Sequence, residues 1–259
     1  MLHTLHYQVL PHENALPSSY DIAMKLIKDF LITAIVCHCC PNDCVVFRGD
    51  FADSIICPIC GAERYSSNKI PSKSFTYFPI GPRIERMFGS PVYSELIQAH
   101  ASSLQDEPDL VYDIQQSTVW KEAYGSDGSF KGDGRGIALS LCADGVNPFH
   151  MNRVQYSMCP LVMSLLNLPR HLRYQFSNLL LVGIIPGPKE PQSMNIYLDI
   201  LVDELVELNT REIYDAHLGE VFNLNVRILS YVLDYPGIGK LFHTLGSGAA
   251  VCGVKFKVP

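Results

Sequence analysis

Four cysteines in two short-spaced pairs form the clearest chemical pattern in this chain. Three residues separate Cys40 from Cys44, two separate Cys57 from Cys60, and twelve lie between the pairs. Zinc prefers four tetrahedral thiolate or imidazole ligands, and two such pairs on facing turns supply them. Because four protein ligands leave no open coordination position, the pattern predicts a structural zinc site and not a catalytic one.

The residues around these cysteines predict a small zinc ribbon. Pro41–Asp43 and Pro58–Ile59, with Gly61 after it, supply a tight turn for each pair. Val45–Phe47 and Ile55–Ile56 are apolar enough to form the two strands of the ribbon. A hairpin of this size has almost no core, so bound metal would contribute on the order of 10 kcal/mol to its folding.

The choice of the first ligand stays open. Cys40 has the cleaner spacing to Cys44, but any of three neighbours could replace it: Cys37, His38 and Cys39. The alternative to a metal site is a set of four reduced and unrelated cysteines.

Two acids that directly follow apolar runs form the second chemical pattern. Ile137–Ala143 is followed by Asp144 and then Gly145, and Val226–Leu233 is followed by Asp234. A strand end is a rigid platform from which an acid can hold a metal ion. The alternative is turn chemistry, because Asp, Gly, Asn and Pro are all favoured where a strand ends.

The elements around these acids predict an α/β core. Runs at 137–143, 154–168 and 179–185 suit three neighbouring strands, 194–210 has the period of an amphipathic helix, and 226–233 is a further strand. A crossover helix makes the first and last strands parallel, which brings Asp144 and Asp234 to one end of the sheet. Carboxylates placed in this way suit Mg²⁺ or Mn²⁺, and two such ions would activate a water and stabilise the leaving oxygen of a phosphodiester. This order of strands and acids is that of a ribonuclease H-like nuclease core.

The composition is that of an intracellular globular protein. The chain has 259 residues, 47% of them hydrophobic and 18% charged, with a net charge of -6. That charge gives no general attraction to nucleic acid, so DNA contacts must come from a local basic patch or a bound cation. We find neither a signal peptide nor an apolar run of the roughly 18–20 residues needed to span a bilayer.

We expect three regions: an N-terminal helix and zinc ribbon (1–66), a basic, proline-rich connector with a helix (67–124), and a catalytic core (125–259). The connector is the most basic stretch of an acidic chain and interleaves aromatic with basic residues, a pattern that could grip a nucleic-acid backbone. Its candidate DNA contacts are Lys69, Lys73, Arg83 and Arg86.

Several long motifs resemble the transposases of CACTA (En/Spm-type) DNA transposons. They are CPNDC at 40–44, CPICGAERY at 57–65, IPSKSFTYFPIGPRIERMF at 70–88, ADGVNPF at 143–149, IIPGPKEP at 184–191, YLDILVDEL at 197–205 and DYPGIGKL at 234–241. The resemblance implies a ribonuclease H-like domain that cuts and joins transposon DNA with an acidic triad and divalent ions. It also implies a nuclear location and an oligomer with other transposase subunits. Asp144 would be the first catalytic acid and Asp234 the second.

The chain departs from that family in two respects. Cys252 lacks the partner of the family's C-x2-C pair, and Pro259 comes before the region where the third acid would occur. We therefore expect either a fragment of a longer gene or a decayed copy, incomplete in its chemistry. The alternative function is a non-catalytic protein that binds DNA or protein through its zinc ribbon.

Overall fold

The computed structural model describes residues 2–11, 13–28, 31–101, 111–149, 156–188, 191, 194–234 and 237–239. The chain forms two compact units, Met1–Thr33 and Ala34–Pro259. The first unit contains α1 (Leu2–Thr4), a π-helical turn η1 (Leu5–Val9) and α2 (Tyr20–Ile27). The hydroxyl of Ser19 accepts a hydrogen bond from the backbone N–H of Ile22 at 3.3 Å and so caps the start of this helix.

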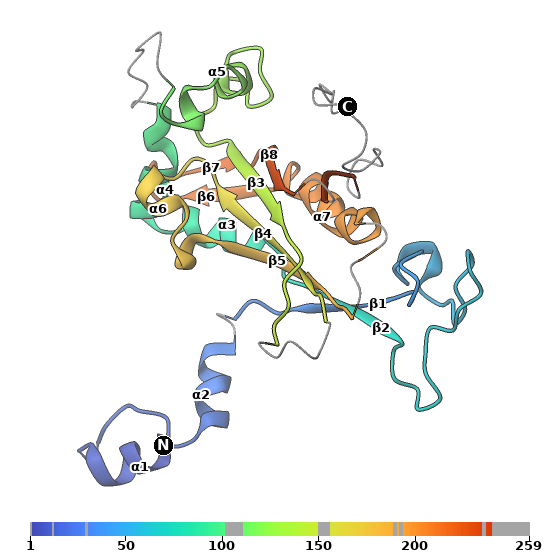
Figure 1. Ribbon diagram of the computed structural model, residues 1–259. Helices are drawn as coiled ribbons and strands as arrows, with labels where there is room; N and C mark the ends of the chain where they lie inside the picture. Colours follow the sequence, from blue (N-terminus) through green and yellow to red (C-terminus); the bar gives the residue numbers. More distant parts are fainter. Residues whose placement is uncertain are drawn as a thin grey trace. The chain divides into compact units, whose positions relative to one another are not determined.

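A six-stranded mixed sheet forms the centre of the second unit (Figure 1). Its strands, in spatial order, are β1 (Ile35–Cys39), β2 (Lys73–Tyr77), β5 (Leu180–Ile185), β4 (Cys159–Leu165), β3 (Ile137–Ala143) and β8 (Val226–Leu233). Neighbouring strands are antiparallel except for β3 and β8, which are parallel. The expected runs at 137–143, 179–185 and 226–233 therefore form strands, and the run at 154–168 contains one that is shorter than the run, Cys159–Leu165. β1 and β2, from earlier in the chain, extend the same sheet.

The parallel pairing of β3 with β8 follows from the helix between β5 and β8. α7 (Asn195–Leu208) lies beside β8 and gives the chain the length it needs to return in the same direction (Figure 1). β3 is almost wholly buried, as its largely apolar sequence, with Ser140 in the middle, predicts for a strand covered on both faces. One face of α7 enters the same core with Tyr197, Leu198, Ile200, Leu201 and Leu208.

Helices and turns cover the sheet. They are η3 (Gly49–Phe51), α3 (Gly81–Phe88), α4 (Pro91–Gln98), η4 (Ala99–Ala101), η5 (Ile114–Gln116), α5 (Thr118–Tyr124), α6 (Arg170–Arg173) and η6 (Phe176–Asn178). In the part of the chain that the structure describes, we find no helix long and apolar enough to cross a membrane.

Glu204 of α7 caps the start of α3. The helical pattern places it on the solvent side with Asp203 and Glu207, but its carboxylate accepts hydrogen bonds from the backbone N–H groups of Ile80 (3.1 Å) and Gly81 (2.9 Å). It also accepts a hydrogen bond from the hydroxyl of Tyr77. An acid at the first turn of α3 satisfies otherwise unpaired N–H groups and interacts well with the helix dipole.

A small hairpin between α7 and β8 was not predicted. Its strands are β6 (Glu212–Asp215) and β7 (Glu220–Asn223), joined by a turn in which Gly219 has φ +73°. The buried carboxylate of Asp215 accepts hydrogen bonds from Ser94 at 2.6 Å and from the backbone N–H of His217 at 2.9 Å. Burial opposes ionisation of this carboxyl, but these donors outweigh it and hold the pKa below its usual value.

Gly183 of β5 provides a test of the packing between the strands. A Cβ at this position would lie 2.4 Å from Cζ of Phe75, whose side chain is fully buried. We expect Gly183→Ala to lower the free energy of unfolding by about 1–3 kcal/mol, as overpacking does elsewhere. Urea denaturation checks this, and the additional change Phe75→Leu should restore part of the loss. A double variant no more stable than the single one would show that this contact is not the cause.

Candidate functional site

Two tight turns build the cysteine cluster. In the first, the N–H of Cys40 donates to Val45 O at 2.9 Å, and Asp43 has the left-handed φ of +55°. In the second, the N–H of Cys57 donates to Ala62 O at 2.8 Å, and Gly61 has φ +74°. Each turn brings the two sulfurs of its pair to the same side.

The strand pairing around these turns differs from the sequence prediction. Val45–Phe47 and Ile55–Ile56 do not pair with each other. Val46 instead forms a bridge with Cys39, and Ile56 forms one with Glu63. Each cysteine pair therefore has its own hairpin. The turn that begins at the first cysteine of each pair reverses the chain, so that the residues after the turn pair with those directly before it.

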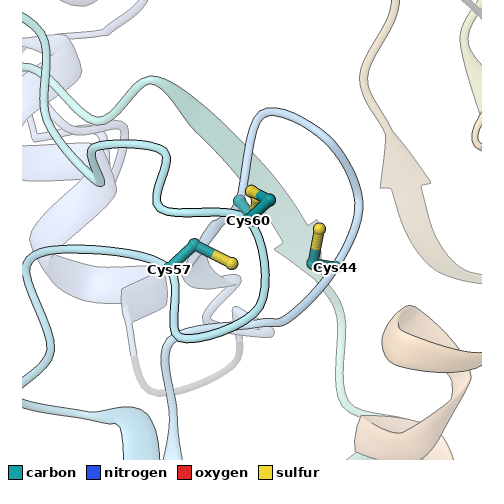
Figure 2. Close-up of side chains that lie close together, drawn as sticks. Cys44, Cys57 and Cys60 are labelled. Carbon is teal, nitrogen blue, oxygen red and sulfur yellow. The ribbon is translucent and has the colours of Figure 1, made fainter.

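The four predicted cysteines meet where these hairpins face each other. The Sγ atoms of Cys40, Cys44, Cys57 and Cys60 all lie within 4.8 Å of one another, and Cys40 and Cys60 are 3.5 Å apart. Figure 2 shows three of these side chains close together. Tetrahedral zinc with Zn–S bonds of ~2.3 Å needs sulfurs ~3.8 Å apart. The spacing fits that donor set to within about an ångström, so the cluster can hold a metal ion such as zinc.

The three alternative ligands lie outside the cluster. Cys39 is fully buried in the core of the sheet, and burial raises the pKa of its thiol to about 12. Cys37, two residues earlier on β1, packs against the same core. His38 accepts a hydrogen bond at Nδ1 from Nε of Arg64 at 3.1 Å, and burial together with this guanidinium lowers its pKa. Cys37 and Cys39 thus share the core face of β1, and His38, on the other face, is held by Arg64, so the cluster consists of the four predicted cysteines.

Cys60 is the cluster's most readily ionised thiol. The side-chain amide of Asn42 and the backbone N–H of Ala62 hold its pKa at about 6, so it carries a thiolate at neutral pH. Burial raises the pKa of the Cys40 thiol. Metal ligation requires thiolates, and Cys60 supplies the first without a preceding loss of a proton.

Asp43 ties the first turn to the rest of the unit. Its carboxylate accepts hydrogen bonds from Lys73 Nζ of β2 and from the hydroxyl of Tyr197 of α7. The side chains of Asp43 and Lys73 are only 7% and 11% exposed. The sequence predicts only a turn at Asp43, because neither partner is near it in the chain.

Asp144 and Asp234 follow strand ends that are in register. β3 and β8 pair up to Ala143 opposite Leu233, so each acid is the next residue after the last pair. Adjacent strands are about 4.8 Å apart. Both acids line one cavity of about 20 Å³, together with Cys159, Met194 and others. A space of that size admits one water-sized particle.

Asp234 also begins a helical turn. Its Oδ1 accepts a hydrogen bond from the N–H of Gly237 at 2.7 Å, and its carbonyl accepts one from the N–H of Ile238 at 2.9 Å. Asp234 therefore has the turn-forming role that the sequence offered as the alternative to metal binding. Tyr235, Pro236 and Cys252 lie outside the described residues.

Four other acids of the same region lie elsewhere. Asp199 and Asp203 line a different cavity, of about 420 Å³, between α7 and residues 44–51, and Asp203 is paired with Arg48 at 2.6 Å. Glu207 pairs with Arg211, and Glu220 pairs with Arg135 at 2.6 Å.

The four candidate DNA contacts divide into two kinds. Lys73 is paired with Asp43, and Arg83 donates to the backbone carbonyls of Phe78 (2.8 Å) and Pro79 (3.1 Å). Both side chains therefore bind groups of the protein itself. Lys69 and Arg86 are exposed.

Comparison with known proteins identifies the family of this chain. No curated protein and no solved structure matches it. Residues 110–256, more than half of the chain, match Transposase_21, described as transposase family tnp2. The matched region contains β3, β8, α7 and both acids of the small cavity, whereas the four cysteines precede it. The chain therefore belongs to the transposase family tnp2.

Proposed function

We propose that this chain is the DNA-cleaving part of a CACTA (En/Spm-type) transposase with a ribonuclease H-like core. In this proposal Asp144 and Asp234 together hold a Mg²⁺ or Mn²⁺ ion at the end of β3 and β8. The observation that carries it is the register of these strands, which ends with one acid after each of two parallel neighbours. Oxygen ligands at that spacing suit a hard divalent ion.

The arrangement of the strands supports the proposed fold. β3, β4 and β5 form an antiparallel series, α7 follows, and β8 returns parallel to β3. This is the order that the resemblance to a ribonuclease H-like core implies. Membership of a transposase family adds a DNA substrate, and the nuclear location and association with further subunits proposed here rest on the same resemblance.

In this proposal the two acids act as ligands of the divalent ion. Two carboxylates facing one small cavity repel each other unless a cation lies between them, so the pair favours a divalent ion. A bound ion would polarise the phosphodiester and lower the pKa of an attacking water. The backbone turn at Gly237 fixes the orientation of the Asp234 carboxylate through Oδ1.

The cysteine cluster has a different role in this proposal. Four thiolates saturate a tetrahedral zinc ion, so the metal there stabilises the two hairpins and takes no part in cleavage. Lys69, on the segment that follows the second hairpin, and Arg86 of α3 remain proposed contacts to DNA phosphates.

A non-catalytic binding protein is the second candidate. It is favoured by the internal use of the other acids near the core: Glu204 caps α3, and Glu207 and Glu220 are in ion pairs. None of these carboxylates is directed to the cavity of Asp144 and Asp234, whose lining does not include them. In this function the zinc hairpins bind DNA or protein while the core serves as a scaffold.

Calorimetric titration with Mn²⁺ separates the two candidates. We expect Asp144→Asn to weaken Mn²⁺ binding about 100-fold or more, because an amide replaces a charged ligand. Asp199→Asn is the matched control, since it removes one exposed carboxylate from α7, and it should bind Mn²⁺ as the wild type does. Equal affinities of the wild type and Asp144→Asn would refute the metal site and leave the non-catalytic function.

A further inference from the structure

The loop between β4 and β5 exposes two aromatic rings. Phe176 is 94% exposed and Tyr174 is 63% exposed, on a loop that includes α6 and η6. Single exposed apolar residues are common on protein surfaces and need no explanation by themselves. Two exposed aromatic rings that are two residues apart, on a firmly anchored loop, do require an explanation.

A buried arginine anchors the base of this loop. Arg173 is 3% exposed, and its guanidinium donates to both carboxylate oxygens of Asp113, at 3.0 and 3.1 Å. Its Nε also donates to the carbonyl of Leu168 at 3.2 Å. A bidentate pair of this kind fixes both position and orientation.

A buried asparagine anchors the other end of the loop. Asn178 is 2% exposed, donates to Leu172 O at 2.9 Å, and accepts a hydrogen bond from the hydroxyl of Tyr93 on α4 at 2.9 Å. Phe176 and Tyr174 therefore project from a backbone held at both ends. Rings presented on a rigid support lose little freedom on binding a ligand, which favours recognition.

The charge and polarity around the rings favour nucleic acid over a protein partner. Residues 166–179 contain no acidic residue in a chain of net charge -6, and Arg170 and His171 on α6 are exposed. Exposed Gln175 and Ser177 flank Phe176, so polar side chains accompany the rings on this loop. Aromatic rings interleaved with basic and polar side chains are typical of surfaces that stack unpaired bases and contact phosphates.

The position of the loop places it away from the two acids. β4 begins at the end of the sheet where Asp144 lies and carries the chain to the opposite end, where the loop contacts α4 through Asn178 and Tyr93. Seven residues of strand span roughly 20 Å, about the length of six stacked base pairs.

We infer that residues 169–178 form a contact for single-stranded DNA, in which Phe176 and Tyr174 stack on unpaired bases and Arg170 contacts phosphate. This inference rests on the proposed function, since it adds a second DNA contact to a protein that acts on DNA ends. Such a contact would hold a strand freed from its complement while the duplex extends towards the acids.

Fluorescence anisotropy with a labelled 20-nucleotide single strand tests the inference. We expect Phe176→Ala to weaken binding about tenfold, because stacking contributes about 1–3 kcal/mol per base. Phe176→Trp should restore wild-type affinity, and a duplex of the same sequence should be bound equally by all three proteins. Tyr214→Ala is the matched control, since it removes an exposed ring from β6 (54% exposed) and should change nothing.

The other outcomes are distinguishable. If the wild type binds DNA and Phe176→Ala binds the single strand equally well, the inference is wrong and the proposed function stands. If the wild type binds neither the single strand nor the duplex, both fail. If Phe176→Ala retains DNA binding but loses self-association in sedimentation, the rings form a protein contact instead. Because Phe176 is almost fully exposed, its removal should leave the melting temperature unchanged.

Discussion

Cys57→Ser is expected to abolish tight zinc binding and to unfold the two hairpins that carry the cysteines. Cys57 is 1% exposed, and its neighbours in the small cluster around it are Cys40, Val45 and Phe47. So few buried side chains contribute little hydrophobic stabilisation, whereas a structural zinc contributes on the order of 10–16 kcal/mol. We expect zinc affinity to fall at least about 1000-fold, because serine does not supply a thiolate at neutral pH.

Metal content after dialysis and competition with a chromophoric chelator would measure this loss. Cys37→Ser is the matched control: it alters a cysteine three residues before Cys40 that packs against the sheet instead. The control should retain zinc with wild-type affinity. Equal zinc content in Cys57→Ser and the wild type would refute the four-cysteine site, and loss of zinc from the Cys37 variant would show that the ligand set is wrong.

Asp43→Ala is expected to be the most destabilising single change outside the cysteines. It leaves the ammonium of Lys73, only 11% exposed, without its carboxylate, and removes the acceptor of the Tyr197 hydroxyl. Breaking a buried ion pair by removing one partner costs about 3–5 kcal/mol. We expect that loss in the free energy of unfolding measured with urea.

Asp50→Ala is the control for this loss, because it removes the same charge from an exposed position on η3. It should change the free energy of unfolding by less than about 0.5 kcal/mol. Equal stabilities of the two variants would mean that the contacts of Asp43 do not hold the first hairpin to β2 and α7.

Local patterns in the sequence were sufficient for the central strands and for the long helix. The apolar runs of β3, β4, β5 and β8 and the helical period of α7 are properties of short stretches, and the structure has each element where it was expected. The cysteine pairs were equally predictable, because the C-x3-C and C-x2-C spacings dictate tight turns that converge their sulfurs.

Contacts between distant parts of the chain were not predictable. Asp43 meets Lys73 and Tyr197, which are 30 and 154 residues away. The basic connector shows the same limit, since its sequence does not reveal that Lys73 and Arg83 satisfy internal acceptors. A charged side chain is interpreted as exposed until its partner is known.

The hairpin of β6 and β7 has one local signal in the sequence. Its strands have only four residues each, which is short for an alternating pattern, but Gly219 lies where a turn needs a positive φ. The exposed rings of the β4–β5 loop had no such signal. From the sequence alone, Phe176 and Tyr174 would be predicted to be core residues. In the structure they are exposed, while the neighbouring Arg173 and Asn178 are buried.

The position of a bound Mn²⁺ ion, found by anomalous X-ray scattering from crystals grown with Mn²⁺, would test the central claim most directly. The account predicts an anomalous peak at the end of β3 and β8, about 2–2.3 Å from one carboxylate oxygen of Asp144 and one of Asp234. A peak bound by other residues, or the two carboxylates turned away from each other with no peak between them, would contradict it.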